Sequence, residues 1–253
     1  MSFVSLLQAD VEEVLAVIDP VQTVFMDPPD NIGLGYGTYQ DKVPDAHYVA
    51  FLQRILGLAM QKANIVWISY NARWTFNVGK IVCDLLEYQP LWEAKACVQT
   101  FTFGQCNQHD LGNNHRPVVR LKKKSSPLYP DAIRVPSWRQ ENGDKRADPR
   151  GKVPGDVLDF TRVTGNSKQR RSWHPTQLNE GLIERCLKLT CNQDDTVLDL
   201  FSGTGTTLRV ARRLEIPVIS VEMDHNYCLQ IALENQLVEN TNPFPWEGSW
   251  YGF

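Results

Sequence analysis

The sequence predicts an α/β protein with a mostly parallel sheet and helices on both of its faces. Short apolar segments rich in β-forming residues alternate with segments of helical period along most of the chain, and strands that alternate with helices favour parallel pairing. The length of 253 residues fits one domain of this class, or one domain with a large insertion. The composition, 42% hydrophobic and 22% charged, is that of an ordinary globular domain.

The first part of the chain contains a strand with a sharply defined end. Residues 21–26 (VQTVFM) are rich in β-forming residues, and the strand must end at Asp27-Pro28-Pro29, because proline cannot donate a ladder hydrogen bond. Residues 10–17 have helical spacing, with acidic side chains early, where they suit a helix N-terminus. The other elements expected here are a strand at 3–7, a mobile glycine-containing loop at 31–45, a helix at 46–63, a strand at 65–70 and a helix at 77–87.

The second part of the chain contains a strand that leads into a glycine-rich turn. Residues 196–201 (TVLDLF) form the predicted strand, and residues 202–206 (SGTGT) form the turn. The other elements expected here are strands at 97–103 and 118–121, a helix at 177–190, a helix at 207–214, a strand at 217–221 ending at Glu222, and a helix at 224–238.

Several classes of protein are excluded by composition. No run of 18 or more apolar residues is present, so no transmembrane helix is expected. The first ten residues lack a basic region and a long apolar stretch, so no signal peptide is expected. None of the six cysteines forms a Cys-x-x-Cys pair, which argues against a zinc ribbon and a disulfide framework. We therefore expect a reducing, cytoplasmic location and no metal site.

Positive charge is concentrated in one segment. Residues 116–171 hold 15 of the 26 Lys and Arg side chains and 6 of the 29 Asp and Glu side chains, a local charge of +9, whereas the remainder carries −12. The segment is also rich in proline, which is typical of loops and short strands. It is predicted to be a phosphate-binding surface, and the alternative is a solvated basic loop.

The glycine-rich turn predicts a nucleoside cofactor site. A buried strand leads into Gly203-x-Gly205 and a helix, so the turn exposes backbone amides and permits close approach of a ligand. Glu222 ends the next strand, 23 residues after Asp199, where an acid can accept hydrogen bonds from both hydroxyls of a ribose. No Gly-Lys-Ser/Thr follows, so the turn is not a phosphate loop.

Asp27-Pro28-Pro29-Asp30 predicts a second site at the end of another strand. Ligands of open α/β sheets bind beyond the carboxyl ends of the strands, so the two sites can face each other. Asp27 and the Pro28 carbonyl are both acceptors, and together they suit an exocyclic NH2 group. Without the first site, a Pro-Pro turn with Asp27 as a helix cap would be the favoured interpretation.

These motifs resemble those of the amino-methyltransferase family that methylates exocyclic amines of DNA bases with S-adenosylmethionine. Asp27-Pro28-Pro29-Asp30 resembles the catalytic Asp-Pro-Pro-Tyr motif, and residues 199–207 resemble the cofactor motif Asp-x-Phe-x-Gly-x-Gly-Thr-Thr. His174-Pro175-Thr176-Gln177 resembles the segment that helps to bind the methionine end of the cofactor. The catalytic motif comes first, which is the circularly permuted order of the β class. The resemblance implies a Rossmann-like methyltransferase fold with a seven-stranded-type sheet.

The resemblance also implies the residues of the site. The implied catalytic residues are Asp27, Pro28, Pro29 and Asp30. The implied cofactor-binding residues are Asp10, His174, Thr176, Asp199, Phe201, Ser202, Gly203, Gly205, Thr206, Thr207 and Glu222. The basic segment is then the DNA-binding region, and its candidate contacts are Lys122, Lys123, Lys124, Arg134, Arg139, Arg170 and Arg171.

The resemblance divides the chain into four parts. They are a catalytic half at 1–115, a basic target-recognition insertion at 116–173, a cofactor-binding half at 174–240 and an aromatic tail at 241–253. The expected activity is adenine-N6 methylation of flipped bases in double-stranded DNA, because Ser is commoner than Asp at the first motif position of the cytosine-N4 enzymes. Whether the chain forms a homodimer stays open.

One departure from the family pattern motivates a rival interpretation. The fourth motif position usually holds an aromatic residue that stacks on the flipped base, and here it holds Asp30. Tyr36, Tyr39, Trp67 and Tyr70 are the candidates to supply the missing ring. The rivals are a cytosine-N4 methyltransferase and an inactive DNA-binding protein that retains the cofactor fold.

Overall fold

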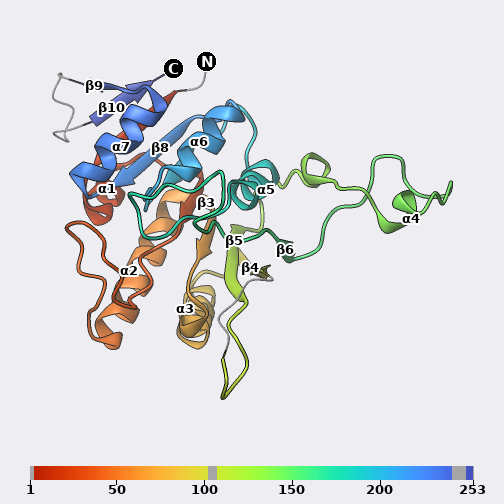
Figure 1. Cartoon of the computed structure of the whole chain (residues 1–253), viewed down its shortest axis with the longest axis horizontal. Helices are drawn as coiled ribbons and strands as arrows, with labels where there is room; N and C mark the ends of the chain where they lie inside the picture. The colour runs from red at the N-terminus through yellow and green to blue at the C-terminus, as the bar shows by residue number, and fades with distance from the viewer. Residues whose placement is uncertain (1–2, 102–106, 241–248, 253) are drawn as a thin grey trace.

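A computed structural model describes residues 3–101, 107–240 and 249–252. Its strands form one sheet with the order β6-β4-β5-β3-β2-β7-β8-β1-β10-β9 (Figure 1). The strands are β1 Val4–Gln8, β2 Val21–Met26, β3 Ala63–Ser69, β4 Trp92–Thr100, β5 His115–Lys123, β6 Val157–Asp159, β7 Val197–Asp199, β8 Val218–Glu222, β9 Val238–Asn240 and β10 Ser249–Gly252.

The α/β prediction is confirmed, with antiparallel additions at both ends of the sheet. Strands β1, β8, β7, β2 and β3 run parallel in the centre. On one side β5 pairs antiparallel with β3, and β4 pairs antiparallel with β5. On the other side β10 pairs antiparallel with β1 and with β9. Within the described part of the chain the sheet therefore has ten strands, more than the seven-stranded type that the resemblance implies.

Helices cover both faces of the sheet, and the two faces form separate cores. Successive strand residues point to opposite faces, so Val24 and Val66 pack in one core while Phe25 and Trp67 pack in the other. The first core buries side chains of α1–α3, and the second buries side chains of α5–α7. The helices are α1 Val11–Val17, α2 Asp45–Lys62, α3 Thr75–Tyr88, α4 Trp138–Glu141, α5 Glu180–Thr190, α6 Thr206–Arg213 and α7 His225–Asn235, with 3-10 turns η1 Ala72–Trp74 and η2 Pro130–Ile133.

The loop after β2 is tied together by one buried side chain. The buried Asp41 carboxylate accepts hydrogen bonds from the backbone N–H groups of Asn31, Ile32, Gly33 and Leu34 at 2.7 to 3.3 Å. Four donors on one carboxylate fix the backbone of the loop, and residues 35 and 40 form an isolated bridge. Asp41 thus supplies hydrogen-bond partners within a segment whose glycines led us to expect a mobile loop.

The basic segment begins with a strand of the sheet. The strand predicted at 118–121 is confirmed as part of β5, residues 115–123, which pairs with β3 and β4, so the loop-rich part of the segment follows β5. Beyond β5 the chain makes few regular elements, and the part that carries α4 projects away from the body (Figure 1). One bridge between Val135 and Lys152 joins the two arms of this projection.

The strand predicted at 97–103 also differs from the structure. It begins earlier, as β4 at Trp92, and residues 102–106 lie outside the described part of the chain. Of the aromatic tail, residues 241–248 and 253 lie outside it as well, while β10 packs on the body by pairing with β1. Among the described helices, none is long and apolar enough to cross a membrane.

Candidate active site

A cavity of about 690 Å³ lies at the carboxyl ends of the parallel strands. The strand ends supply its polar wall, because Asp10 follows β1, Asp27 follows β2, and Asp199 and Glu222 end β7 and β8. All four implied catalytic residues and all the implied cofactor residues except Gly205 line this one space. The parallel sheet thus brings together segments that are more than 200 residues apart, such as those of Asp10 and Glu222.

The turn between β7 and α6 requires glycine at two positions. Gly203 and Gly205 have φ angles of +51° and +69°, in the left-handed region. A Cβ on Gly203 would lie 3.2 Å from the His174 ring, and one on Gly205 would lie 2.9 Å from Ile231 Cγ2. Gly205 therefore shapes the turn without lining the cavity. The absence of a side chain on Gly203 leaves room for the His174 ring to pack against the turn.

Two carboxyls face the cavity beside this turn, of which Asp199 is buried and Glu222 is partly exposed. Glu222 accepts hydrogen bonds from the backbone N–H groups of Gly203 and Asp224, both at 2.9 Å. Asp199 accepts from the backbone N–H of Phe201 at 3.3 Å. Burial raises the pKa of each carboxyl to about 7. Both groups are therefore acceptors whose charge a donating ligand would stabilise.

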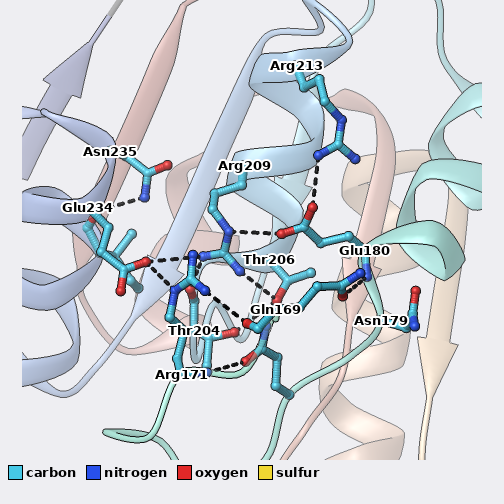
Figure 2. Close-up of polar contacts among 12 residues, drawn as sticks. Gln169, Arg171, Asn179, Glu180, Thr204, Thr206, Arg209, Arg213, Glu234 and Asn235 are labelled. Carbon is cyan, nitrogen blue, oxygen red and sulfur yellow. Dashed lines mark hydrogen bonds and ion pairs between the residues drawn. The ribbon is translucent and has the colours of Figure 1, made fainter. Parts of the chain in front are cut away.

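The glycine turn is supported from behind by the largely buried Arg209 (Figure 2). Its guanidinium donates to the Thr204 carbonyl, to Thr206 Oγ1 at 3.4 Å and to Glu180 Oε1 at 3.3 Å, and Glu234 Oε2 lies 3.9 Å away. Glu180 belongs to α5 and Glu234 to α7, so one side chain ties three helices to the turn. Arg171, which precedes His174, also binds Glu234.

We expect Arg209→Met to destabilise the fold by about 2 kcal/mol, because the substitution leaves the Thr204 carbonyl without its charged donor. Glu180 retains Arg213 at 2.8 Å, which limits the loss. Urea denaturation measures the change. The matched control is Arg54→Met, whose ion pair with Glu12 is half exposed and should contribute less than about 1 kcal/mol. Equal losses for both variants would contradict the role of Arg209.

His174 lies between the glycine turn and the loop after β2. Burial lowers its pKa to about 4, so the ring is neutral at pH 7. His174 Nδ1 lies 2.6 Å from the Thr176 carbonyl oxygen, and the Tyr36 and His174 ring centroids are 5.4 Å apart. The same loop donates from the Thr38 backbone N–H to Asp224 at 2.9 Å. This contact joins the segment after β2 to the cofactor half across the cavity.

The Asp27-Pro28-Pro29-Asp30 turn surrounds a side chain that sequence reasoning missed. Arg116, at the start of β5, donates to Asp27 Oδ1 at 2.6 Å and to both carboxylate oxygens of Asp30 at 3.0 and 3.1 Å. Its Nε donates to Ser69 Oγ at 2.7 Å. Burial raises the pKa of Asp27, and the Arg116 guanidinium opposes that rise. Asp30 thus forms an ion pair with Arg116, and its carboxylate offers no ring on which a flipped base could stack.

The structure separates the aromatic candidates into two groups. Tyr36 and Tyr39 line the cavity. Trp67 and Tyr70 are buried in the two cores, both at 3% exposure, and do not line it, so the prediction that either supplies the ring is wrong. Phe101, which the sequence did not single out, lines the cavity with Arg162 over its ring at 5.1 Å.

The predicted DNA contact of Lys122 is wrong. Its side chain is 7% exposed, and its Nζ donates to the carbonyls of Lys123, Lys124 and Ser126 and pairs with Glu93. This end of β5 pairs with the start of β3, about 20 Å from the cavity end of the strand. Lys123 and Lys124 lie at the same far edge. A run of lysines read from sequence does not show which edge of a sheet it occupies.

The other predicted DNA contacts lie in the projection and beside the cavity. Arg139 is exposed on α4, while Arg134 is paired with Asp131 at 2.6 Å. Arg170 donates to the Pro175 carbonyl at 3.3 Å, and Arg171 is bound to Glu234. None of these four lines the cavity, and the arginines that do are Arg73, Arg116 and Arg162.

Comparison with known proteins shows the family to which the chain belongs. Residues 21–233 match a family model described as DNA methylase, the N6/N4 type. The chain is 34% identical over 221 residues to the type II methyltransferase M.ScaI of Streptomyces caespitosus, covering 81% of this chain and 71% of that protein. It is 26% identical over 232 residues to the DNA adenine methyltransferase YhdJ of Escherichia coli, covering 83% and 74%.

A solved structure shares the fold. The crystal structure of the M1.HpyAVI–SAM complex has a TM-score of 0.66 with 18% identity, and the match covers 92% of this chain and 100% of that chain. The family model matches most of the chain. The glycine turn and the Asp-Pro-Pro turn, which carry the motifs of that family, lie in one cavity. The chain belongs to the N6/N4 family of S-adenosylmethionine-dependent DNA amino-methyltransferases.

Proposed function

We propose that the protein is a site-specific adenine-N6 methyltransferase acting on flipped bases of double-stranded DNA. The observation that carries the proposal is that Asp27, Glu222 and the glycine turn share one 690 Å³ cavity. An aspartate at the first motif position favours adenine, and the relative YhdJ is named a DNA adenine methyltransferase. The rival assignment is cytosine-N4 methylation, because the family includes both activities.

The residues around the glycine turn fit S-adenosylmethionine. Neither Gly203 nor Gly205 tolerates a Cβ without a shift of its neighbour, and the buried Ser202 hydroxyl has no hydrogen-bond partner among the described residues. Glu222, Asp10, His174 and Thr176 line the same cavity. In this proposal Glu222 accepts from the ribose hydroxyls, Asp10 lies near the nucleobase, and the His174–Thr176 segment binds the methionine end. When bound, the cofactor supplies an electrophilic methyl group.

Asp27 and the Pro28 carbonyl are the acceptors for the amine of the target base. Both lie where β2 ends against the cavity. An amine that attacks a methyl group becomes cationic, so a carboxylate held beside it stabilises the transition state more than the ground state. Asp27 acts by hydrogen bonding and charge, with no covalent step on the protein. Within this proposal Pro28 and Pro29 fix the turn, and Asp30 acts through Arg116.

The experiment that tests the function is incubation of the protein with unmethylated DNA and labelled S-adenosylmethionine, followed by nucleoside mass spectrometry. N6-methyladenine is the expected product. Detection of N4-methylcytosine instead would show that the rival assignment, cytosine-N4 methylation, is the correct one. DNA binding without any methyl incorporation would identify an inactive DNA-binding protein and overturn the proposal.

Affinity for S-adenosylmethionine should fall as the pH is lowered through about 7. The pKa of Asp199 and that of Glu222 are each raised to about 7 by burial, and hydrogen-bond donors of the ligand favour the ionised carboxylates. Binding is therefore strongest above pH 7 and weakens below it, by up to about tenfold per pH unit for each group. Calorimetry between pH 6 and 8 measures the change. His174 does not contribute, because its pKa is about 4. A dissociation constant independent of pH would contradict this view of the two carboxyls.

The projection that carries α4 is proposed as the target-recognition region. Trp138 is 71% exposed, and the neighbouring Arg139 is exposed as well. We expect replacing both by alanine to weaken DNA binding by about tenfold or more, because an exposed aromatic and a cation contact bases and phosphates. Fluorescence anisotropy measures DNA affinity, and S-adenosylmethionine affinity should not change. The control is Tyr88→Ala, an exposed aromatic at the end of α3. An equal effect of the control would argue against the projection.

A further inference from the structure

The turn at the catalytic motif holds more negative charge than its family pattern suggests. Asp27 and Asp30 both face one cation, Arg116, whose side chain is 18% exposed, and Asp30 is 9% exposed. Asp27, which is 23% exposed, and Asp30 share this guanidinium at the wall of the cavity, where limited exposure to water strengthens their interactions with it and with each other. The arrangement therefore fixes both the geometry and the charge of Asp27.

Arg116 is fixed from three sides. Asp30 accepts from two of its nitrogens, in the bidentate geometry that fits a guanidinium to a carboxylate. Ser69, the last residue of β3, accepts from Nε at 2.7 Å. With these contacts made, Nη2 lies 2.6 Å from Asp27 Oδ1. The guanidinium cannot turn without breaking several bonds, so it also fixes the Asp27 carboxylate.

Asp30 is itself held in place. Its carbonyl accepts from the buried Trp74 Nε1 at 2.8 Å, and its Oδ2 lies 3.5 Å from Asn71 Nδ2. These contacts come from the segment that follows β3. Asp30, which stands where the family usually has an aromatic residue, is therefore held in a defined position by its neighbours.

We propose, on the basis of the proposed function, that Arg116 is a positioning residue for methyl transfer. It holds Asp27 through Oδ1 without bonding Oδ2, so that the carboxylate can face the amine of the target base, and it balances the charge that Asp30 adds. Asp30 serves as the anchor of Arg116.

The titratable groups around Asp27 determine the sign of the expected effects. Burial raises the pKa of Asp27, and the charge of Asp30 raises it further, while Arg116 and Ser69 oppose the rise. Asp199 interacts unfavourably with Asp27 from β7. Tyr36 and Tyr48 also face the two carboxylates, and burial raises the pKa of each phenol, so both stay neutral. Removal of Arg116 should therefore raise the pKa of Asp27, and removal of the Asp30 charge should lower it.

The test is a titration of the Asp27 carboxyl by carbon NMR in the full chain, with the signal assigned by comparison with Asp27→Asn. Arg116→Met should raise the pKa by one unit or more, and Asp30→Asn should lower it. Arg116→Lys should give an intermediate value, and it keeps the test valid if the methionine variant does not fold. This readout needs no enzymatic activity, so it separates the inference from the proposed function.

The kinetic arm uses labelled S-adenosylmethionine and unmethylated DNA. Arg116→Met should lower kcat at pH 7 by about 10²-fold, with recovery as the pH is raised and with unchanged cofactor affinity. The control Arg54→Met, which breaks a surface ion pair with Glu12, should leave activity unchanged. Opposite or absent shifts of the Asp27 titration would overturn the inference. A loss of kcat that is the same at every pH would also overturn it, because Arg116 would then be only structural.

Discussion

Replacement of Asp27 by alanine is expected to lower methyl transfer by about 10²-fold or more. The substitution removes a carboxylate whose hydrogen bond strengthens as the target amine becomes cationic, so the loss should appear in kcat and not in KM. Incorporation of labelled methyl groups into DNA at saturating cofactor measures it.

The fold should survive this substitution. Arg116 keeps its bidentate contact with Asp30 and its bond to Ser69, so no buried cation is left without a partner. Thermal denaturation and cofactor affinity should therefore match those of the unmodified chain. The variant Asp27→Asn retains the shape, but its one amide oxygen must accept from Arg116. Its NH2 group then faces the target amine, so this variant should lose activity as well while keeping the fold. Full activity of Asp27→Ala would remove Asp27 from the catalytic assignment.

Replacement of Glu222 by alanine is expected to weaken S-adenosylmethionine binding by roughly 2–4 kcal/mol, or about 30-fold to 10³-fold in the dissociation constant. The variant loses the acceptor proposed for the ribose hydroxyls. It also frees the backbone N–H of Gly203, which Glu222 Oε2 now holds at 2.9 Å. Both effects act on the cofactor side of the cavity.

Calorimetry at pH 8, where Glu222 is mostly ionised, measures this change most directly. Glu222→Gln keeps one acceptor oxygen and should lose less affinity than the alanine variant. Glu184→Gln, which removes a charge paired on the surface of α5, serves as the control and should bind normally. An unchanged dissociation constant for Glu222→Ala would refute the assignment of the ribose site.

The parts of the site that lie on one strand and its following turn could be predicted from sequence. Residues 21–26 and the prolines after them define where β2 ends, and Gly203 and Gly205 define the turn before α6. In a parallel sheet these ends meet at one edge, so local patterns suffice to place Asp27 opposite Glu222. The predicted helix at 46–63 likewise differs from α2 by one residue at each end.

The parts that depend on pairing between distant segments could not be predicted. Arg116 reaches Asp27 because β5 runs antiparallel to β3, a direction that the sequence of β5 does not specify. The same reversal puts Lys122 at the far edge of the sheet, where carbonyl groups surround its ammonium. Both residues were assigned to one basic segment, yet the antiparallel direction gives them opposite surroundings.

The position of β1 affects the order in which the protein can fold during synthesis. Its two neighbours in the sheet, among the residues that the structure describes, are β8 and β10, so the strand near the start of the chain pairs with residues 218–222 and 249–252. Chain closure over such separations slows folding. On the ribosome, residues 4–8 must wait with both edges unpaired until these distant strands have emerged, so β1 is among the last strands to be paired.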